Sequence, residues 1–156
     1  MKNSYSNIFP LNKKTLKKTI RLLAKWGLVA LPTETVYGLA GNAYLSRAIK
    51  KIFKLKGRPK FNPLIIHYYN IQQTIDDVIV NDDFKKLYKK LCTGPITFIL
   101  KKKKNSKIQP LANAKRNTSS ARFPKHKVLT TLLKNFNLPS AAPSANISSN
   151  LSPVCA

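Results

Sequence analysis

Two of the chain's cations stand where an anion could be bound. Lys56 and Arg58 flank a glycine in "KLKGRPKFNPL" (54–64), and two prolines stiffen the loop that follows. A guanidinium binds phosphate or carboxylate in a bidentate manner, whereas a lysine acts as a point charge. Arginine is rare in this lysine-rich chain, so its use here favours an anion-binding loop. The alternative is that both cations neutralise carbonyls at the end of the preceding helix.

A second stretch, "ALPTETVYGLAG" (30–41), places hydroxyls beside a carboxylate. Glu34, the only glutamate of the chain, lies between Thr33 and Thr35 directly after an apolar run. Ligands of α/β proteins bind at such strand ends, so a binding role is one interpretation. An ordinary strand-to-helix turn with threonine caps would use the same residues.

A third stretch, "AAPSANISS" (141–149), combines small residues with hydroxyls and amides. Its small side chains would let a flat ligand approach the backbone, while Ser144 and Asn146 hydrogen-bond the edge of that ligand. Turns are built from the same residue types, so this stretch alone indicates little.

The remaining candidate residues limit the reactions that the chain could catalyse. His67 ends an apolar strand and His126 follows a proline, and a lone histidine of this kind is usually structural. The sequence shows no nucleophile elbow, no Walker glycine loop and no metal-ligand spacing, so we expect no protein-held metal. Cations, hydroxyls and amides are suited to positioning a phosphate and stabilising its charge.

Alternating helices and short apolar strands must position these residues. Apolar spacing predicts helices over 12–27, 44–57, 82–91 and 127–136, with Asn12, Gly27 and Gly57 as caps. Strands are expected within 28–31, 63–69, 94–104, 119–123 and 138–146. This order predicts an α/β fold with a mixed sheet. We expect one domain over residues 1–156, with 1–11 loose.

The composition is strongly basic. The formal charge of the 156 residues is +24, a field that attracts polyanions such as nucleic acids. Lysines spread among many asparagines and isoleucines also arise from A/T-rich codon drift, so both explanations stay open. We find no membrane span and no secretory signal, and we expect a cytoplasmic chain with Cys92 and Cys155 reduced.

Taken together, these stretches resemble the YrdC-type threonylcarbamoyl-AMP synthase family. Five segments follow that family's order and approximate spacing: "LPTETVYGL", "KIFKLKGRPKFNPLIIH", "GPITFIL", "ARFPKH" and "APSANIS". The resemblance covers about residues 11–153. It implies a YrdC-like open, twisted mixed sheet with helices packed on it.

The resemblance also implies an activity. The family condenses L-threonine, bicarbonate and ATP, with Mg²⁺ accompanying the ATP, into threonylcarbamoyl-AMP and pyrophosphate. This product serves the t6A modification of tRNA, so the resemblance implies t6A-transfer proteins downstream and a possible contact with tRNA or other RNA. Catalysis would need no covalent enzyme intermediate and no tightly bound cofactor.

Roles for individual residues follow from the same resemblance. Lys56 and Arg58 would be catalytic, with Lys56 neutralising phosphate charge near the reacting centre. L-threonine would be held by Thr35, His67 and Arg122. ATP would be contacted by Arg58, Asn62, Thr118, Ala142, Ser144, Asn146 and Ser152.

The chain departs from the family pattern at three places. Cys92-Thr93 replaces the usual Trp-Pro, Ser149 replaces a glycine, and we expect the family's C-terminal portion to be missing after residue 156. Two other interpretations therefore stay open: a non-catalytic module that binds double-stranded RNA or tRNA, and an inactive truncated remnant.

Overall fold

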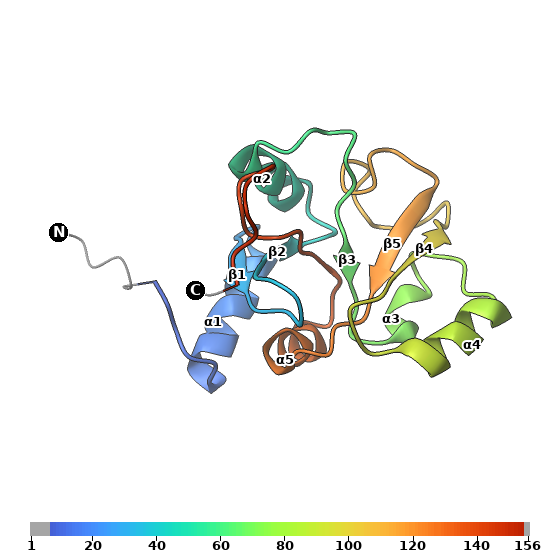
Figure 1. Ribbon diagram of the computed structural model, residues 1–156, viewed down its shortest axis with the longest axis horizontal. Coiled ribbons are helices and arrows are strands. Elements are labelled where there is room, and N and C mark those ends of the chain that lie inside the picture. The colour runs from blue at the N-terminus through green and yellow to red at the C-terminus, as the bar shows by residue number, and fades with distance from the viewer. Residues whose placement is uncertain (1–6, 155–156) are drawn as a thin grey trace.

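The structure is a computed structural model that describes residues 7–154. Six strands form one sheet in the order β1-β2-β6-β3-β5-β4, with five helices packed around it (Figure 1). In chain order the elements are α1 (Lys13–Ala24), β1 (Val29–Leu31), β2 (Gly38–Asn42), α2 (Ser46–Lys56), β3 (Ile66–His67), α3 (Ile71–Thr74), α4 (Asp82–Leu91), β4 (Thr97–Lys101), β5 (Thr118–Arg122), α5 (Lys127–Phe136) and β6 (Ser140–Ala141).

The topology brings distant segments together at the middle of the sheet. β6 pairs antiparallel with β2 on one side and with β3 on the other. β3 and β5 are parallel, with His67 beside Arg122, while β4 pairs antiparallel with β5. The expected mixed sheet is therefore confirmed, and the ends of β3 and β5 place two predicted site residues next to each other.

Helices cover both faces of the sheet. Neighbouring residues of a strand point to opposite faces. Ala40 of β2 belongs to a core cluster with Leu129 and Leu133 of α5, and α1 contributes Leu23 to the same cluster. A Cβ built on the next residue, Gly41, would approach Ile52 of α2 at 3.2 Å. α1 and α5 therefore lie on one face, and α2 lies on the other.

The expected helices are confirmed, with their ends set by local caps. Asn12 caps α1 in a reciprocal capping box with Thr15. The expected C-cap at Gly27 is wrong, because the helix ends at Ala24 and Lys25 is its C-cap. Gly57 ends α2 with a φ of 58°, a left-handed conformation that glycine adopts at little cost. α4 and α5 keep the expected bounds.

Four of the five expected strands are shorter than expected, β5 keeps its length but begins one residue earlier, and two elements had not been predicted. Only residues 66–67 and 140–141 of the expected strands 63–69 and 138–146 pair regularly. Sequence reasoning missed β2, whose "GLAGN" lacks the β-branched and aromatic residues typical of strands, and the single-turn helix α3.

Two expectations fall partly outside the described residues. The first is the loose segment 1–11, of which residues 1–6 are not described. The second is that both cysteines are reduced: Cys92 is a free cysteine, and Cys155 is not described. Within residues 7–154, no helix is both long and apolar enough to cross a membrane.

Candidate functional site

Six of the predicted site residues line a single cavity of about 220 Å³. These six are Thr35, Arg58, His67, Arg122, Ala142 and Ser144. They come from the β1–β2 loop, the loop after α2, the ends of β3 and β5, and the segment after β6. The fold thus brings together the "TET", "KGR", "ARFP" and "PSAN" stretches, which are far apart in the sequence. Arg58 and Ser144 in particular line the same cavity.

Arg58 lies in the wall of this cavity and is held by its own loop. Its Nε donates to the carbonyl oxygen of Asn62 at 3.1 Å, and its Nη2 donates to Asn62 Oδ1 and to the carbonyl of Pro63, both at 2.9 Å. Asn62 therefore contacts Arg58 and does not line the cavity itself. The prolines and this hydrogen-bonded loop fix the guanidinium in place before any ligand binds.

Lys56 supports the cavity from behind. Its side chain is buried, and its Nζ donates to the backbone carbonyls of Ser144 and Asn146. In return, the backbone amide of Ser148 donates to the carbonyl of Lys56 at 2.7 Å. Burial, and then repulsion from Arg58, lower the pKa of Lys56. In this structure Lys56 joins α2 to the loop of Ser144, while its contact with a phosphate stays a prediction.

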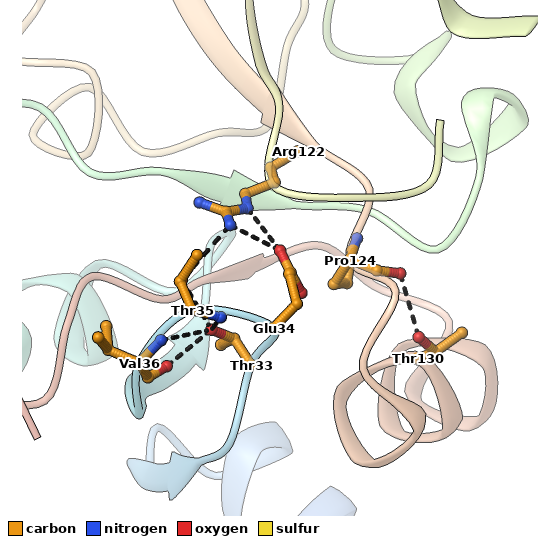
Figure 2. Close-up of polar contacts among 7 residues, drawn as sticks. All are labelled: Thr33, Glu34, Thr35, Val36, Arg122, Pro124 and Thr130. Carbon is orange, nitrogen blue, oxygen red and sulfur yellow. Dashed lines mark hydrogen bonds and ion pairs between the residues drawn. The ribbon is translucent and has the colours of Figure 1, made fainter. Parts of the chain in front are cut away.

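Arg122 forms a nearly buried ion pair with Glu34 (Figure 2). Its Nε and Nη2 donate to Glu34 Oε1 at 2.9 and 2.6 Å, and Nη2 also approaches Thr35 Oγ1 at 3.5 Å. The remaining nitrogen of the guanidinium points away from Glu34 (Figure 2). Nε and Nη2 of Arg122 are thus both engaged by the β1–β2 loop, and only the third nitrogen has no contact drawn (Figure 2).

The loop that carries Glu34 is ordered by a hydroxyl. Thr33 Oγ1 accepts from the backbone amides of Thr35 and Val36 and donates to the carbonyl of Val36 at 2.7 Å. Burial alone would raise the pKa of Glu34, but hydrogen bonds from its own backbone and from Arg122, with the charge of Arg122, keep that pKa below its ordinary value. Glu34 therefore stays ionised as the partner of Arg122.

His67 is a neutral side chain in the cavity wall. It is fully buried, and this burial, followed by the charge of Arg122, lowers its pKa to about 4. Its Nδ1 is buried and has no hydrogen-bond partner among the described residues. A buried polar atom without a partner costs free energy.

The other predicted site residues lie outside the cavity wall. Thr118 begins β5, about 13 Å along the strand from Arg122. Asn146 turns its amide nitrogen to the carbonyls of Ile147 and Asn150, and Ser152 is exposed in the C-terminal segment. Their proposed contacts with a nucleotide stay predictions.

Sequence reasoning missed several residues of the wall. These are Val36, Gly38, Ile65 and Pro143, while Thr33, already noted beside Glu34 in the sequence, also lines the cavity. Of these residues, Gly38 could have been identified from the sequence, because a glycine inside a strand often marks a place where a ligand or another segment comes close. A Cβ at Gly38 would lie 3.4 Å from that of Ala142. The partnership of Glu34 with Arg122, 88 residues away, left no local signal.

Charge is divided unequally within the site. Near Arg122, the carboxylate of Glu34 cancels the cation and His67 is neutral. Near Arg58, the hydrogen-bond acceptors are neutral carbonyl and amide oxygens. One end of the cavity is therefore close to neutral while the other end is cationic, an arrangement that suits a zwitterion beside a polyanion.

Comparisons with known proteins identify a family. Residues 21–156 match the model of the Sua5/YciO/YrdC family, which carries the description "Telomere recombination". The threonylcarbamoyl-AMP synthase of Bacillus subtilis is 40% identical over 144 residues, which are 91% of this chain and 41% of the relative. That of Pyrococcus abyssi is 41% identical over 133 residues, 83% of this chain and 38% of the relative. The chain thus spans about two fifths of the length of these relatives.

Solved structures give the same result. Sua5 of P. abyssi in complex with L-threonine superposes with a TM-score of 0.87 at 35% identity, covering 93% of this chain and 42% of that one. YciO of Escherichia coli has a TM-score of 0.79 at 20% identity, covering 90% and 68%, which supports the fold alone. With the family model matching most of its residues, the chain belongs to the Sua5/YciO/YrdC family.

Proposed function

We propose that this chain forms the substrate-binding core of a threonylcarbamoyl-AMP synthase. In the proposed reaction the amine of L-threonine attacks bicarbonate, and water leaves to give a carbamate. A carbamate oxygen then attacks the α-phosphorus of ATP, and the bond to pyrophosphate breaks. The observation that carries the proposal is the single cavity that joins Arg122, Thr35 and His67 to Arg58 and Ser144.

The near-neutral end of the cavity suits L-threonine. The free edge of Arg122 would donate to the carboxylate of the amino acid, because guanidinium and carboxylate match in geometry and charge. Glu34 fixes the other edge, so the guanidinium is oriented before the substrate arrives. Thr35 and His67, which both line the cavity, would hydrogen-bond the polar groups of the substrate.

The cationic end suits the phosphates of ATP. Arg58 is held by Asn62 and Pro63 and would stabilise negative charge that develops as pyrophosphate leaves. The described residues hold no group of three or more histidine, cysteine or acidic side chains that could bind a metal. Mg²⁺ commonly binds through substrate phosphates and water, so we propose that it arrives with the nucleotide.

The size of the cavity limits what it encloses. Small-molecule sites usually measure about 300–1,000 Å³, and this one measures about 220 Å³. It therefore suits an amino acid and the reacting phosphate, while the base of the nucleotide would lie outside it. Positioning the amine, bicarbonate and α-phosphate together would supply much of the rate acceleration.

The first test of the proposal is turnover. The purified chain is incubated with ATP, L-threonine and bicarbonate, and pyrophosphate release is measured with each substrate omitted in turn. Release that depends on all three, and that is lost in Arg58→Ala, supports the proposal. Release that continues without threonine would contradict it, as would no release under conditions where a full-length synthase is active.

Threonine binding is tested separately by calorimetry. Arg122→Ala should abolish binding, because the carboxylate loses its partner. Arg116→Ala is the matched control, since Arg116 is exposed and does not line the cavity. Equal losses in both variants would show that general charge, rather than the site, determines affinity.

The proposed product also implies where the chain works. Threonylcarbamoyl-AMP is a reactive intermediate for the t6A modification of tRNA, so we propose that proteins of t6A transfer act after this chain, in the cytoplasm. Contact with tRNA itself is a further part of this proposal.

A further inference from the structure

Large apolar side chains are exposed at the end of α2 and in the segment that lies beside it. Of the six most exposed ones within residues 7–154, five come from two short segments, 55–61 and 147–154. We name these five the apolar patch: Leu55, Phe61, Ile147, Leu151 and Val154. Their exposed fractions run from 61% for Ile147 to 96% for Leu151. Single exposed apolar residues are common on protein surfaces, whereas a group of this kind is typical of a binding surface.

Hydrogen bonds hold the two segments against each other. The backbone amide of Ser148 donates to the carbonyl of Lys56 at 2.7 Å, and the Nζ of Lys56 donates to the carbonyl of Asn146. Figure 1 shows the end of the described chain running alongside α2. Leu55 precedes Lys56 and Ile147 precedes Ser148, so the residues that carry these two apolar side chains are neighbours in space.

The loops of the apolar patch are ordered by their own hydrogen bonds. Asn146 Nδ2 donates to the carbonyls of Ile147 and Asn150 at 2.7 and 2.8 Å, and the amide of Asn150 donates to the carbonyl of Ile147 at 3.1 Å. In the other segment, residues 59–62 form a hydrogen-bonded turn with Phe61 near its tip. A surface that is ordered in advance loses less conformational entropy when a partner binds, which favours specific binding.

The rim of the apolar patch is cationic. Lys51 lies one helical turn before Leu55 and Lys60 precedes Phe61, and both lysines are exposed. None of the acidic residues of the chain lies in either segment; they are Glu34, Asp76, Asp77, Asp82 and Asp83. An apolar centre with a polar rim is the usual composition of a protein–protein interface. A partner that complements this surface presents apolar side chains flanked by carboxylates.

Other occupants fit the apolar patch less well. A second copy of this chain would bring two cationic rims together, and like charges oppose association. A helix that lies on a membrane presents one apolar face along its length. The apolar patch is instead formed by a helix end, a turn and a loop. An acidic polypeptide satisfies both the apolar centre and the cationic rim.

We infer that the apolar patch docks a polypeptide segment whose apolar side chains are flanked by Asp or Glu. None of the five patch residues lines the cavity, so the inference stands or fails independently of the proposed synthase activity. Arg58, which does line the cavity, lies between Leu55 and Phe61 in the sequence. The docked segment would therefore lie beside the cavity without occupying it.

The test compares two variants that lose the same apolar residue types at different places. The patch variant replaces one isoleucine and two leucines of the apolar patch: Leu55→Gln, Ile147→Gln and Leu151→Gln. The matched control replaces one isoleucine and two leucines at the end of α3 and in α4: Ile75→Gln, Leu87→Gln and Leu91→Gln. All six side chains are exposed and glutamine is a good helix former, so circular dichroism should show that both variants fold.

The probe is a fluorescein-labelled helical peptide of about 16 residues, with leucines at positions i, i+3, i+4 and i+7 and glutamates elsewhere. Its binding is measured by fluorescence anisotropy. Each apolar anchor lost from the centre of an interface weakens binding about fivefold or more, so the patch variant should bind at least about 100-fold more weakly than the native chain. The control variant should keep the native affinity. A second peptide, with serine in place of each leucine, should bind weakly and equally to all three proteins.

A second readout locates the peptide on the surface. In an NMR titration, the backbone amide signal of Ser148, which lies between the two segments of the apolar patch, should shift. The amide signal of Leu87 in α4 should not shift. If the threefold patch variant fails to fold, Leu151→Gln alone should weaken binding about fivefold, because this side chain is almost fully exposed and takes no part in the core.

Several results would overturn the inference. Equal affinity of the native chain and the patch variant for the leucine peptide would mean that net charge alone attracts it. No binding of that peptide by the native chain would exclude the proposed chemistry of the partner. A native dimer that the patch variant abolishes, seen by analytical ultracentrifugation, would assign the surface to a second copy. Loss of binding to anionic vesicles, with peptide binding unchanged, would assign it to a membrane.

Discussion

The ion pair between Arg122 and Glu34 should couple the stability of two distant segments. The perturbation is a double-mutant cycle with Glu34→Met, Arg122→Met and both together. The two side chains are only 11% and 14% exposed, so removing one partner leaves the other poorly solvated. Breaking a buried pair costs about 3–5 kcal/mol. We expect about 3 kcal/mol for each single variant, because the pair lies at a cavity and keeps some contact with water.

The double variant is the informative member of the cycle. Replacing a whole buried pair by apolar residues of similar volume is often close to neutral. The double substitution should therefore cost less than either single one. Urea denaturation at pH 7 measures all four free energies of unfolding. If the double variant instead costs the sum of the two single ones, the pair is not coupled and the reasoning fails.

Acid provides a check on the sign of the effect. The pKa of Glu34 is lowered in the folded chain, so the pair contributes its full stability above the unfolded value of about 4.3. That contribution is lost as the pH falls through the lower folded value. The gap in stability between the native chain and Glu34→Gln should therefore shrink below about pH 4. A gap that stays constant down to pH 2 would mean that Glu34 acts without its charge.

Three more predictions follow from buried groups. His67, with a pKa of about 4, should stay neutral between pH 5 and 8, and its imidazole signals in an NMR titration should not move; a midpoint near 6.5 would refute its burial. Gly41→Ala should cost about 1 kcal/mol in urea denaturation, because its Cβ would displace the end methyl groups of Leu28 and Ile52, which lie 2.7 and 3.2 Å away; an unchanged midpoint would contradict that packing. Asp77→Asn should cost about 1.5–3 kcal/mol, since the buried carboxylate accepts from the hydroxyl of Tyr68 at 3.2 Å. Burial, and then the charge of Asp77, raise the pKa of Tyr68, so the phenol stays neutral and donates to this carboxylate; an unchanged urea midpoint in Asp77→Asn would contradict the contact.

Elements with strong local signals could be predicted from the sequence. Asn12 and Gly57 mark helix ends through hydrogen bonds and backbone angles that depend on near neighbours, and both act as caps in the structure. β2 could not be found in this way. Its "GLAGN" has no strand-like pattern, and it forms a strand because β1 and β6 supply partners on both sides.

The same distinction holds for the site. Arg58 and Ser144 could be identified because each lies in a segment with an unusual local composition, and the fold brings both to one cavity. The function of Lys56 as a support could not, because it depends on the carbonyls of Ser144 and Asn146, which tertiary structure alone brings near. Glu34 drew attention as the only glutamate, but its partner is 88 residues away.

The place of β6 has a consequence for synthesis on the ribosome. β1 and β2 join the rest of the sheet through β6 alone, and β6 emerges about 100 residues after β2. At about 5–20 residues per second, the nascent hairpin waits roughly 5–20 s with an open edge. During that interval its free amides and carbonyls can pair with another strand. A chaperone that covers this edge during translation would therefore raise the yield of folded chain more than one added after release.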